Sequence, residues 1–212
     1  MLLKDKIDFY GVFSVKAYDA AGNIVDEYTE KNLIMDEARK NMAQLIGGVT
    51  TAGDIQGSKI DKFVIGTLGH VGTDILDYKK VGENGFDSTR TALFSEATTG
   101  AKNYRIPFDV SGGLDVTVNA TGTMYSGGSS SFTDPTNAIS VQRVVGGDFG
   151  RTVTYTVTIP ATCANSGDVS NPVVAYTEAA LYAGGEIFSM KTFPARVKED
   201  TVKFEITWSI IF

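Results

Sequence analysis

The chain has very little of the chemistry on which protein cross-linking and nucleophilic catalysis usually depend. Its 212 residues include one cysteine, Cys163, and one histidine, His70. A single cysteine can form neither an intramolecular disulfide nor a cysteine-based zinc site, which excludes a disulfide-rich secreted scaffold and a zinc finger. A chain without disulfides suits synthesis in a reducing cytoplasm.

Long apolar runs and basic clusters are also lacking. No segment approaches the roughly 18 consecutive apolar residues of a membrane-spanning helix. The first residues, MLLKDKIDFYG, lack the continuous apolar stretch of a secretory signal. The 19 lysines and arginines are outnumbered by 25 aspartates and glutamates, for a formal net charge of −6. We therefore expect neither a membrane nor nucleic acid as a partner.

The balance of glycine, proline and aromatic residues favours β structure. Proline is scarce, with 5 residues, whereas glycine reaches 23 and aromatic residues make up 10% of the chain. Such a composition favours short strands joined by glycine turns. The length admits either one large β domain or two small ones.

Alternation of apolar and polar residues predicts strands along most of the chain. Between residues 152 and 159, threonines alternate with valine, tyrosine and isoleucine, as expected for a sheet with one buried face. The predicted strands cover residues 9–18, 24–28, 60–66, 91–96, 104–110, 114–120, 139–145, 151–160, 173–182, 187–193 and 202–212. Residues 67–80 are expected to form a loop.

The terminal strand has the clearest alternation. Its large apolar side chains share one face of the strand, and leaving them in water would be costly. We therefore predict that this strand lies inside a sheet or in a subunit contact. The candidate assembly interface consists of Phe204, Ile206, Trp208, Ile210 and Phe212.

One segment has helical rather than strand periodicity. Ala38, Met42, Leu45 and Ile46 fall on one side of a helix, which predicts an amphipathic helix near residues 34–46. Gly47-Gly48 can supply its C-terminal cap.

The segment 121–138 is rich in glycine and serine and has few apolar residues, which predicts a flexible loop. We find no internal repeat. The expected fold is mainly β: a single antiparallel, jelly-roll-like β-sandwich domain spanning residues 1–212, with one short amphipathic helix.

Catalytic and metal-binding patterns are weak. His70 is the only available base for a Ser-His-Asp or Cys-His system, but it lies among glycines after a short predicted strand, and we interpret it as a turn or interface histidine. The acidic residues match no calcium-binding loop. Convergence of Asp109, Asp115 and Glu178 into a site for glycoside cleavage remains an alternative. We expect no catalytic residue, no cofactor and no metal site.

Five short segments, in this order, resemble virion structural proteins of tailed bacteriophages. In those proteins an early strand leads to an NLI sequence and a short helix, and a later strand ends in an LGT-like turn. An EA-x-L-F/Y segment, a strand containing IF and a final alternating strand with tryptophan follow. The corresponding segments here are Asn32-Leu33-Ile34, Ile65-Gly66-Thr67, Glu178-Ala179-Ala180-Leu181-Tyr182, Ile187-Phe188-Ser189-Met190-Lys191 and Phe204-Glu205-Ile206-Thr207-Trp208.

The resemblance implies a non-enzymatic structural component of the virion, assembled in the host cytoplasm. It implies symmetric copies that serve as a tail, collar or fibre-attachment protein, with other virion proteins and copies of itself as partners. Capsid decoration on the head surface is the alternative location. A carbohydrate-binding or carbohydrate-cleaving module is the alternative class of function.

Overall fold

The structure is a computed structural model that describes residues 10–47, 59–126, 129–146, 151–166 and 172–212. In chain order its elements are β1 (Tyr10–Tyr18), β2 (Ile24–Ile34), α1 (Asp36–Gly47), β3 (Ile60–Gly66), β4 (His70–Val71), β5 (Asp74–Tyr78), β6 (Lys102–Pro107), β7 (Asp115–Ala120), β8 (Thr123–Ser126), β9 (Ser129–Thr133), β10 (Ile139–Gly146), β11 (Thr152–Ile159), β12 (Val174–Ala183), β13 (Glu186–Lys198) and β14 (Lys203–Ile211).

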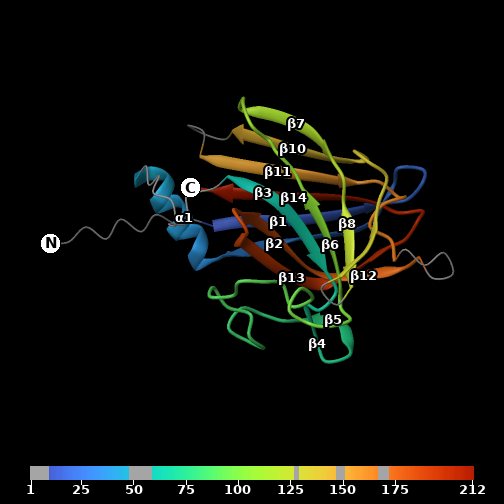
Figure 1. Cartoon of the computed structure of the whole chain (residues 1–212). Helices are drawn as coiled ribbons and strands as arrows, with labels where there is room; N and C mark the ends of the chain where they lie inside the picture. The colour runs from blue at the N-terminus through green and yellow to red at the C-terminus, as the bar shows by residue number, and fades with distance from the viewer. Residues whose placement is uncertain (1–9, 48–58, 127–128, 147–150, 167–171) are drawn as a thin grey trace.

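Twelve strands form one antiparallel sheet in the order β7-β10-β11-β14-β1-β2-β13-β12-β3-β6-β8-β9. The sheet curls so that β3 and β6 cross over β14 and β1 (Figure 1). Its two halves are joined through β2 and β13 by two residue pairs, Leu33 with Met190 and Ile34 with Ser189. The prediction of a mainly β, antiparallel fold with one short helix is confirmed. The jelly-roll-like sandwich is not confirmed, because these twelve strands belong to one continuous curled sheet.

The core lies between these two halves and is rich in aromatic rings. Phe13 of β1 stacks on Phe193 of β13 with ring centroids 5.1 Å apart, and it meets Trp208 of β14 edge-on at 4.9 Å. Phe63 of β3 approaches Trp208 at 6.4 Å. Strands such as β1 and β14 bury every second residue, which explains the alternation in their sequences.

The helix α1 begins two residues later than predicted and ends at Gly47. Asp36 and Glu37 lie in its first turn, where acidic side chains complement the positive end of the helix dipole. Ala38 is fully buried, but Leu45, predicted on the same apolar stripe, is 54% exposed. In the described part of the chain, no helix has the length and apolarity needed to cross a bilayer.

The hairpin of β4 and β5 occupies part of the segment predicted as a loop, residues 67–80. It is anchored by Lys79, whose backbone amide donates to the Gly69 carbonyl at 2.8 Å and whose Nζ donates to the Leu68 carbonyl at 2.5 Å.

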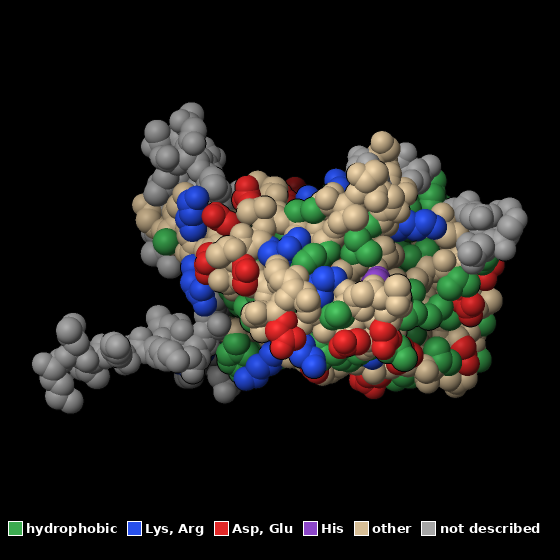
Figure 2. All heavy atoms as spheres, turned by 90° about the horizontal axis from the view of Figure 1, so that it is seen from below, with side chains coloured by type: hydrophobic (Ala, Val, Ile, Leu, Met, Phe, Trp, Pro, Cys, Tyr) green, Lys and Arg blue, Asp and Glu red, His purple; other side chains and the backbone are tan. Residues whose placement is uncertain are grey.

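Seen from below, the molecule shows cationic and anionic side chains interspersed, so this face presents no large area of one charge sign (Figure 2).

The prediction of a loop over residues 121–138 is wrong in its secondary structure. The strands β8 and β9 form an antiparallel hairpin, and β8 also pairs with β6. Met124 is fully buried and anchors this hairpin in the core. The backbone hydrogen bonds come from β6, a partner about 20 residues away, which local composition does not reveal. Residues 127–128 lie outside the described residues.

The segment 91–96, predicted as a strand, has no strand structure. The backbone amides of Phe94 and Ser95 instead donate to the side chain of Glu178, each at 2.8 Å. A side-chain carboxylate thus takes the place of a neighbouring strand.

Candidate functional site

The terminal strand β14 lies inside the sheet, between β1 and β11. Phe204, Ile206, Trp208 and Ile210 are at most 2% exposed, whereas Phe212 is 45% exposed. The first four pack in the protein's own core and offer no surface to a second subunit. The interface hypothesis is corrected for these four residues, because the other half of the same chain covers their apolar face.

Phe212 lies beside an apolar hollow at the end of the fold where α1 and the C-terminus come together (Figure 1). The hollow has a volume of about 160 Å³. We call it the end surface, and its lining residues are Met42, Leu45, Lys59, Ile60, Val153, Tyr155, Phe188, Ile210 and Phe212. Ile60, Phe188 and Ile210 are buried, so Leu45 and Phe212 are the exposed large apolar side chains of its rim.

Local structure explains why both side chains line this hollow. Phe212 continues β14, and its backbone amide donates to the Arg151 carbonyl at 2.9 Å, which holds the last residue beside β11. The apolar stripe of α1 is covered at Ala38, half-covered at Met42 and uncovered at Leu45. The helix therefore carries more apolar surface than the described part of the fold covers.

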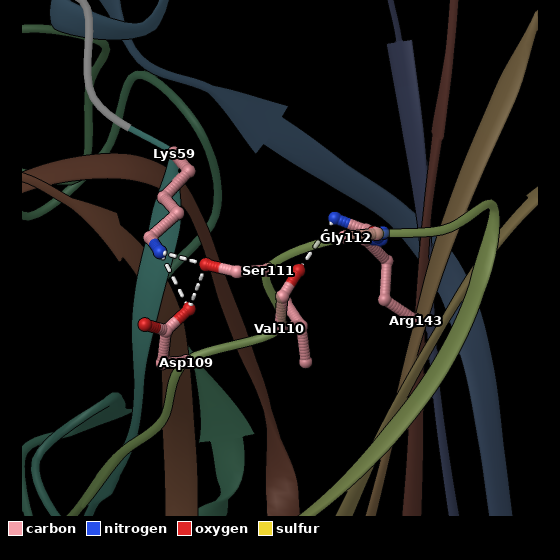
Figure 3. Close-up of polar contacts among 6 residues, drawn as sticks. All are labelled: Lys59, Asp109, Val110, Ser111, Gly112 and Arg143. Carbon is pink, nitrogen blue, oxygen red and sulfur yellow. Dashed lines mark hydrogen bonds and ion pairs between the residues drawn. The ribbon is translucent and has the colours of Figure 1, made fainter.

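Among the described residues of the lining, Lys59 is the only charged one, and its side chain bonds to the segment between β6 and β7 (Figure 3). Its Nζ lies 2.5 Å from the Asp109 carboxylate and 2.5 Å from the Ser111 hydroxyl. Hydrogen bonds from Lys59 and Ser111 lower the pKa of Asp109. The charge of Lys59 is thus paired, and the hollow keeps its apolar character.

The same segment is held from the other half of the sheet by Arg143 of β10. Its guanidinium donates to the Val110 carbonyl at 2.7 Å and to the Gly112 carbonyl at 2.5 Å (Figure 3). Lys59 and Arg143 therefore fasten the crossing from β6 to β7 to both halves of the sheet. This arrangement is structural and contains no buried reactive group.

The three carboxylates considered for glycoside cleavage do not converge. Glu178 pairs with Gly66 at the end of β3, whereas Asp109 binds Lys59 just before the start of β3. At about 3.3 Å per residue these positions are about 20 Å apart along the strand. Asp115 begins β7 at the edge of the sheet. The alternative of a site built from Asp109, Asp115 and Glu178 is therefore contradicted.

His70 lies in β4, and its Nδ1 is buried with no hydrogen-bond partner among the residues that the structure describes. Within the described ranges, no three His, Cys, Asp or Glu residues are placed to hold a metal ion.

Glu178 is a buried structural node. Its carboxylate accepts the backbone amides of Phe94 and Ser95 at 2.8 Å each and that of Leu68 at 3.3 Å. Burial raises its pKa, and these hydrogen bonds offset only part of that rise. One side chain thereby fastens two irregular segments to the sheet.

The close packing around Glu178 gives a testable prediction at Gly66. A Cβ on Gly66 would lie 2.0 Å from Ser95 Oγ and 2.7 Å from Glu178 Oε1. We expect Gly66→Ala to lower the free energy of unfolding by about 1–3 kcal/mol in urea denaturation, through overpacking. The matched control is Gly146→Ala, because the nearest atom to its Cβ is 3.9 Å away. Equal stability of the two variants would contradict this packing.

Ser189 is a second buried node. Its hydroxyl receives a hydrogen bond from the Asn32 amide and another from Trp208 Nε1 at 3.2 Å. It donates to the Leu33 carbonyl at 3.0 Å. The five segments that carry the phage resemblance thus contribute residues to these two nodes, where they hold the fold together.

A cluster of polar and aromatic side chains, which we call the polar seam, lies where β2 and β13 diverge. Its members are Tyr28 and Glu30 of β2, Tyr78 of β5, and Lys191 and Arg196 of β13. Lys191 Nζ lies 2.5 Å from the Glu30 carboxylate and 5.6 Å from the centre of the Tyr78 ring. The depression beside this pair has a volume of about 190 Å³.

The electrostatics of the seam favour a fixed ion pair. Burial acts to raise the pKa of Glu30, but hydrogen bonds from Lys191 and Tyr78 act against it, and the pKa lies below its ordinary value. Glu30 is therefore an ionised carboxylate near neutral pH, which does not suit a general acid. The seam can bind a polar ligand or tie the two halves together.

Sequence reasoning identified Phe212 and placed Met42 and Leu45 on one helix face, but it missed the other residues of the end surface and the whole polar seam. Both sites combine strands that are far apart in the sequence, and periodicity does not report such proximity.

Compared with known proteins, the chain matches no protein-family model, no curated protein and no solved structure.

Proposed function

We propose that the chain is a non-enzymatic structural component of a tailed bacteriophage virion, assembled in symmetric copies as a tail, collar or fibre-attachment protein. The sequence resemblance supports the virion. The observation that carries the assembly role is the end surface, where Leu45 and Phe212 expose large apolar side chains around the same hollow. Capsid decoration on the head surface is the alternative location.

The partner proposed for the end surface is a second copy of this chain. Leu45 and Phe212 are 54% and 45% exposed beside a hollow of about 160 Å³. The patch therefore offers both a protrusion and a recess, and a two-fold interface requires such a self-complementary surface. Burying these side chains would remove apolar area that is costly to leave in water.

Leu45→Glu tests this contact. A charge buried in an apolar interface is costly, so we expect the variant to associate at least about tenfold more weakly than the natural chain in sedimentation equilibrium. Leu76→Glu is the matched control: Leu76 is 66% exposed on β5, in the hairpin away from α1, and its substitution should leave association unchanged. A natural chain that stays monomeric at all concentrations, or equal effects of the two variants, would contradict the proposal.

A carbohydrate-binding module is the second candidate, and the polar seam is the observation that favours it. The rings of Tyr28 and Tyr78 meet at 6.4 Å beside the pair of Glu30 and Lys191. Small-molecule sites combine aromatic faces with a few directed polar groups. Glycan-array binding by the natural chain that is lost in Tyr78→Ala would favour this function, and absence of binding in both would count against it.

A further inference from the structure

Lys198, the last residue of β13, is fully buried. Its Nζ lies 2.8 Å from the Ala161 carbonyl, 3.0 Å from the Glu199 carbonyl and 3.1 Å from Asn165 Oδ1. Lysine is almost never fully buried unless it is paired with an opposite charge. In the described part of the chain no ion pair joins Lys198 to a carboxylate, and the three oxygens that accept its hydrogen bonds are neutral.

The amide of Asn165 is held against this lysine. Its Nδ2 donates to the Ala161 carbonyl at 2.9 Å, the same oxygen that accepts from Lys198. The preceding residue, Ala164, is fixed on both sides: its amide donates to Asp134 at 2.7 Å and its carbonyl accepts from the Tyr176 hydroxyl at 2.7 Å. The separation of Lys198 and Asn165 is therefore set by a rigid surrounding network.

Burial also makes the lysine more reactive. It lowers the pKa of Lys198 to about 8, although the neighbouring Cys163, Asp134, Asp200 and Glu199 act in the opposite direction. About one molecule in ten then carries the neutral amine at pH 7. The neutral amine is the nucleophilic form of lysine.

We propose that Lys198 and Asn165 form an intramolecular isopeptide bond. The neutral Nζ of Lys198 attacks Cγ of Asn165, and a bond between Nζ and Cγ forms as the bond between Cγ and Nδ2 breaks. The proton lost by Nζ ends on Nδ2, which leaves as ammonia. No oxidant, metal or external reactant is needed. The hydrogen bond of 3.1 Å from Nζ to Oδ1 holds the amine next to the carboxamide whose Cγ it attacks, and such fixed proximity is what makes an intramolecular reaction fast.

The bond would act as a disulfide does in other β proteins. It would tie the segment after β11 to the end of β13 and close a covalent loop from residue 165 to residue 198. Such a closure restricts the unfolded chain. The inference concerns the fold of this chain and does not depend on its proposed function.

Mass spectrometry of the natural chain tests the proposal directly. The intact mass should be lower than the mass of the sequence by one ammonia. Trypsin cuts after Arg151, Lys191, Arg196 and Lys203, but the bond blocks cleavage after Lys198. Digestion should therefore yield a branched peptide that joins residues 152–191 to residues 197–203.

Variants test whether Lys198 and Asn165 are the two residues that form the bond. Lys198→Met and Asn165→Ala should each retain the full mass of their sequences and give no branched peptide. Lys31→Met, the same substitution at an exposed lysine, should still lose one ammonia. If the first two variants fail to fold, the peptide map of the natural chain decides alone.

Two results would overturn the proposal. One is an intact mass equal to that of the sequence, with separate linear peptides. The other is a loss of ammonia that maps elsewhere, for example to a succinimide at Asn84, which precedes a glycine.

Discussion

Replacing Trp208 with alanine is expected to lower the free energy of unfolding by about 3–5 kcal/mol. Trp208 is 1% exposed, and its ring contacts Phe13 at 4.9 Å and Phe63 at 6.4 Å between centroids. These rings come from both halves of the sheet, so alanine leaves a cavity between them. The Ser189 hydroxyl also loses the indole donor. Urea denaturation followed by far-ultraviolet circular dichroism measures the effect, since the variant has no tryptophan fluorescence.

The matched control is Phe212→Ala. Phe212 continues the same strand but is 45% exposed, so its substitution should cost far less than that of Trp208 in the isolated chain. If the two variants lose similar stability, the core does not lie where the contacts of Trp208 place it.

Replacing Glu178 with alanine is expected to cost about 3 kcal/mol or more, because it leaves three backbone donors without their acceptor and each orphaned buried donor costs about 1–3 kcal/mol. The donors are the amides of Leu68, Phe94 and Ser95. Urea denaturation measures the loss. Asp109→Ala, at an exposed carboxylate, is the control and should have little effect. A Glu178→Ala variant as stable as this control would contradict the structural role of the node.

The raised pKa of Glu178 adds a pH dependence to this prediction. The folded state binds the proton of this carboxyl more tightly than the unfolded chain does. Its contribution to stability is therefore fully present below the unfolded pKa and is lost as the pH rises through the folded pKa. Glu178→Gln does not titrate, so the stability of the natural chain relative to this variant should fall as the pH rises above the ordinary glutamate pKa of about 4.3. A difference that stays constant or grows with pH would contradict the assignment.

Alternation predicted the strands where a strand buries one face against the opposite half of the sheet. The strand 60–66 matches β3 at both ends, and 151–160 exceeds β11 by one residue at each end. Alternation failed at 91–96, where the amides of Phe94 and Ser95 bond to Glu178, and at 123–133, where pairing with β6 creates a hairpin from a serine-rich segment. Such partners are distant in the sequence, and local patterns carry no information about them.

The candidate site was predicted only in part for a related reason. Alternation places Trp208 and Phe212 on one face, but it does not say whether that face is covered by the same chain or by another. The structure buries Trp208 in the core and leaves Phe212 at the surface. Leu45 likewise belongs to an apolar helical stripe, and its exposure depends on how far the sheet extends beneath α1.

An electron-microscopy reconstruction of the source particle tests the assembly role most directly. We expect copies of this chain at symmetry-related positions, with Leu45 and Phe212 buried against a neighbouring copy. Particles that lack the chain, or that contain it with the end surface facing solvent, would contradict the proposed assembly role.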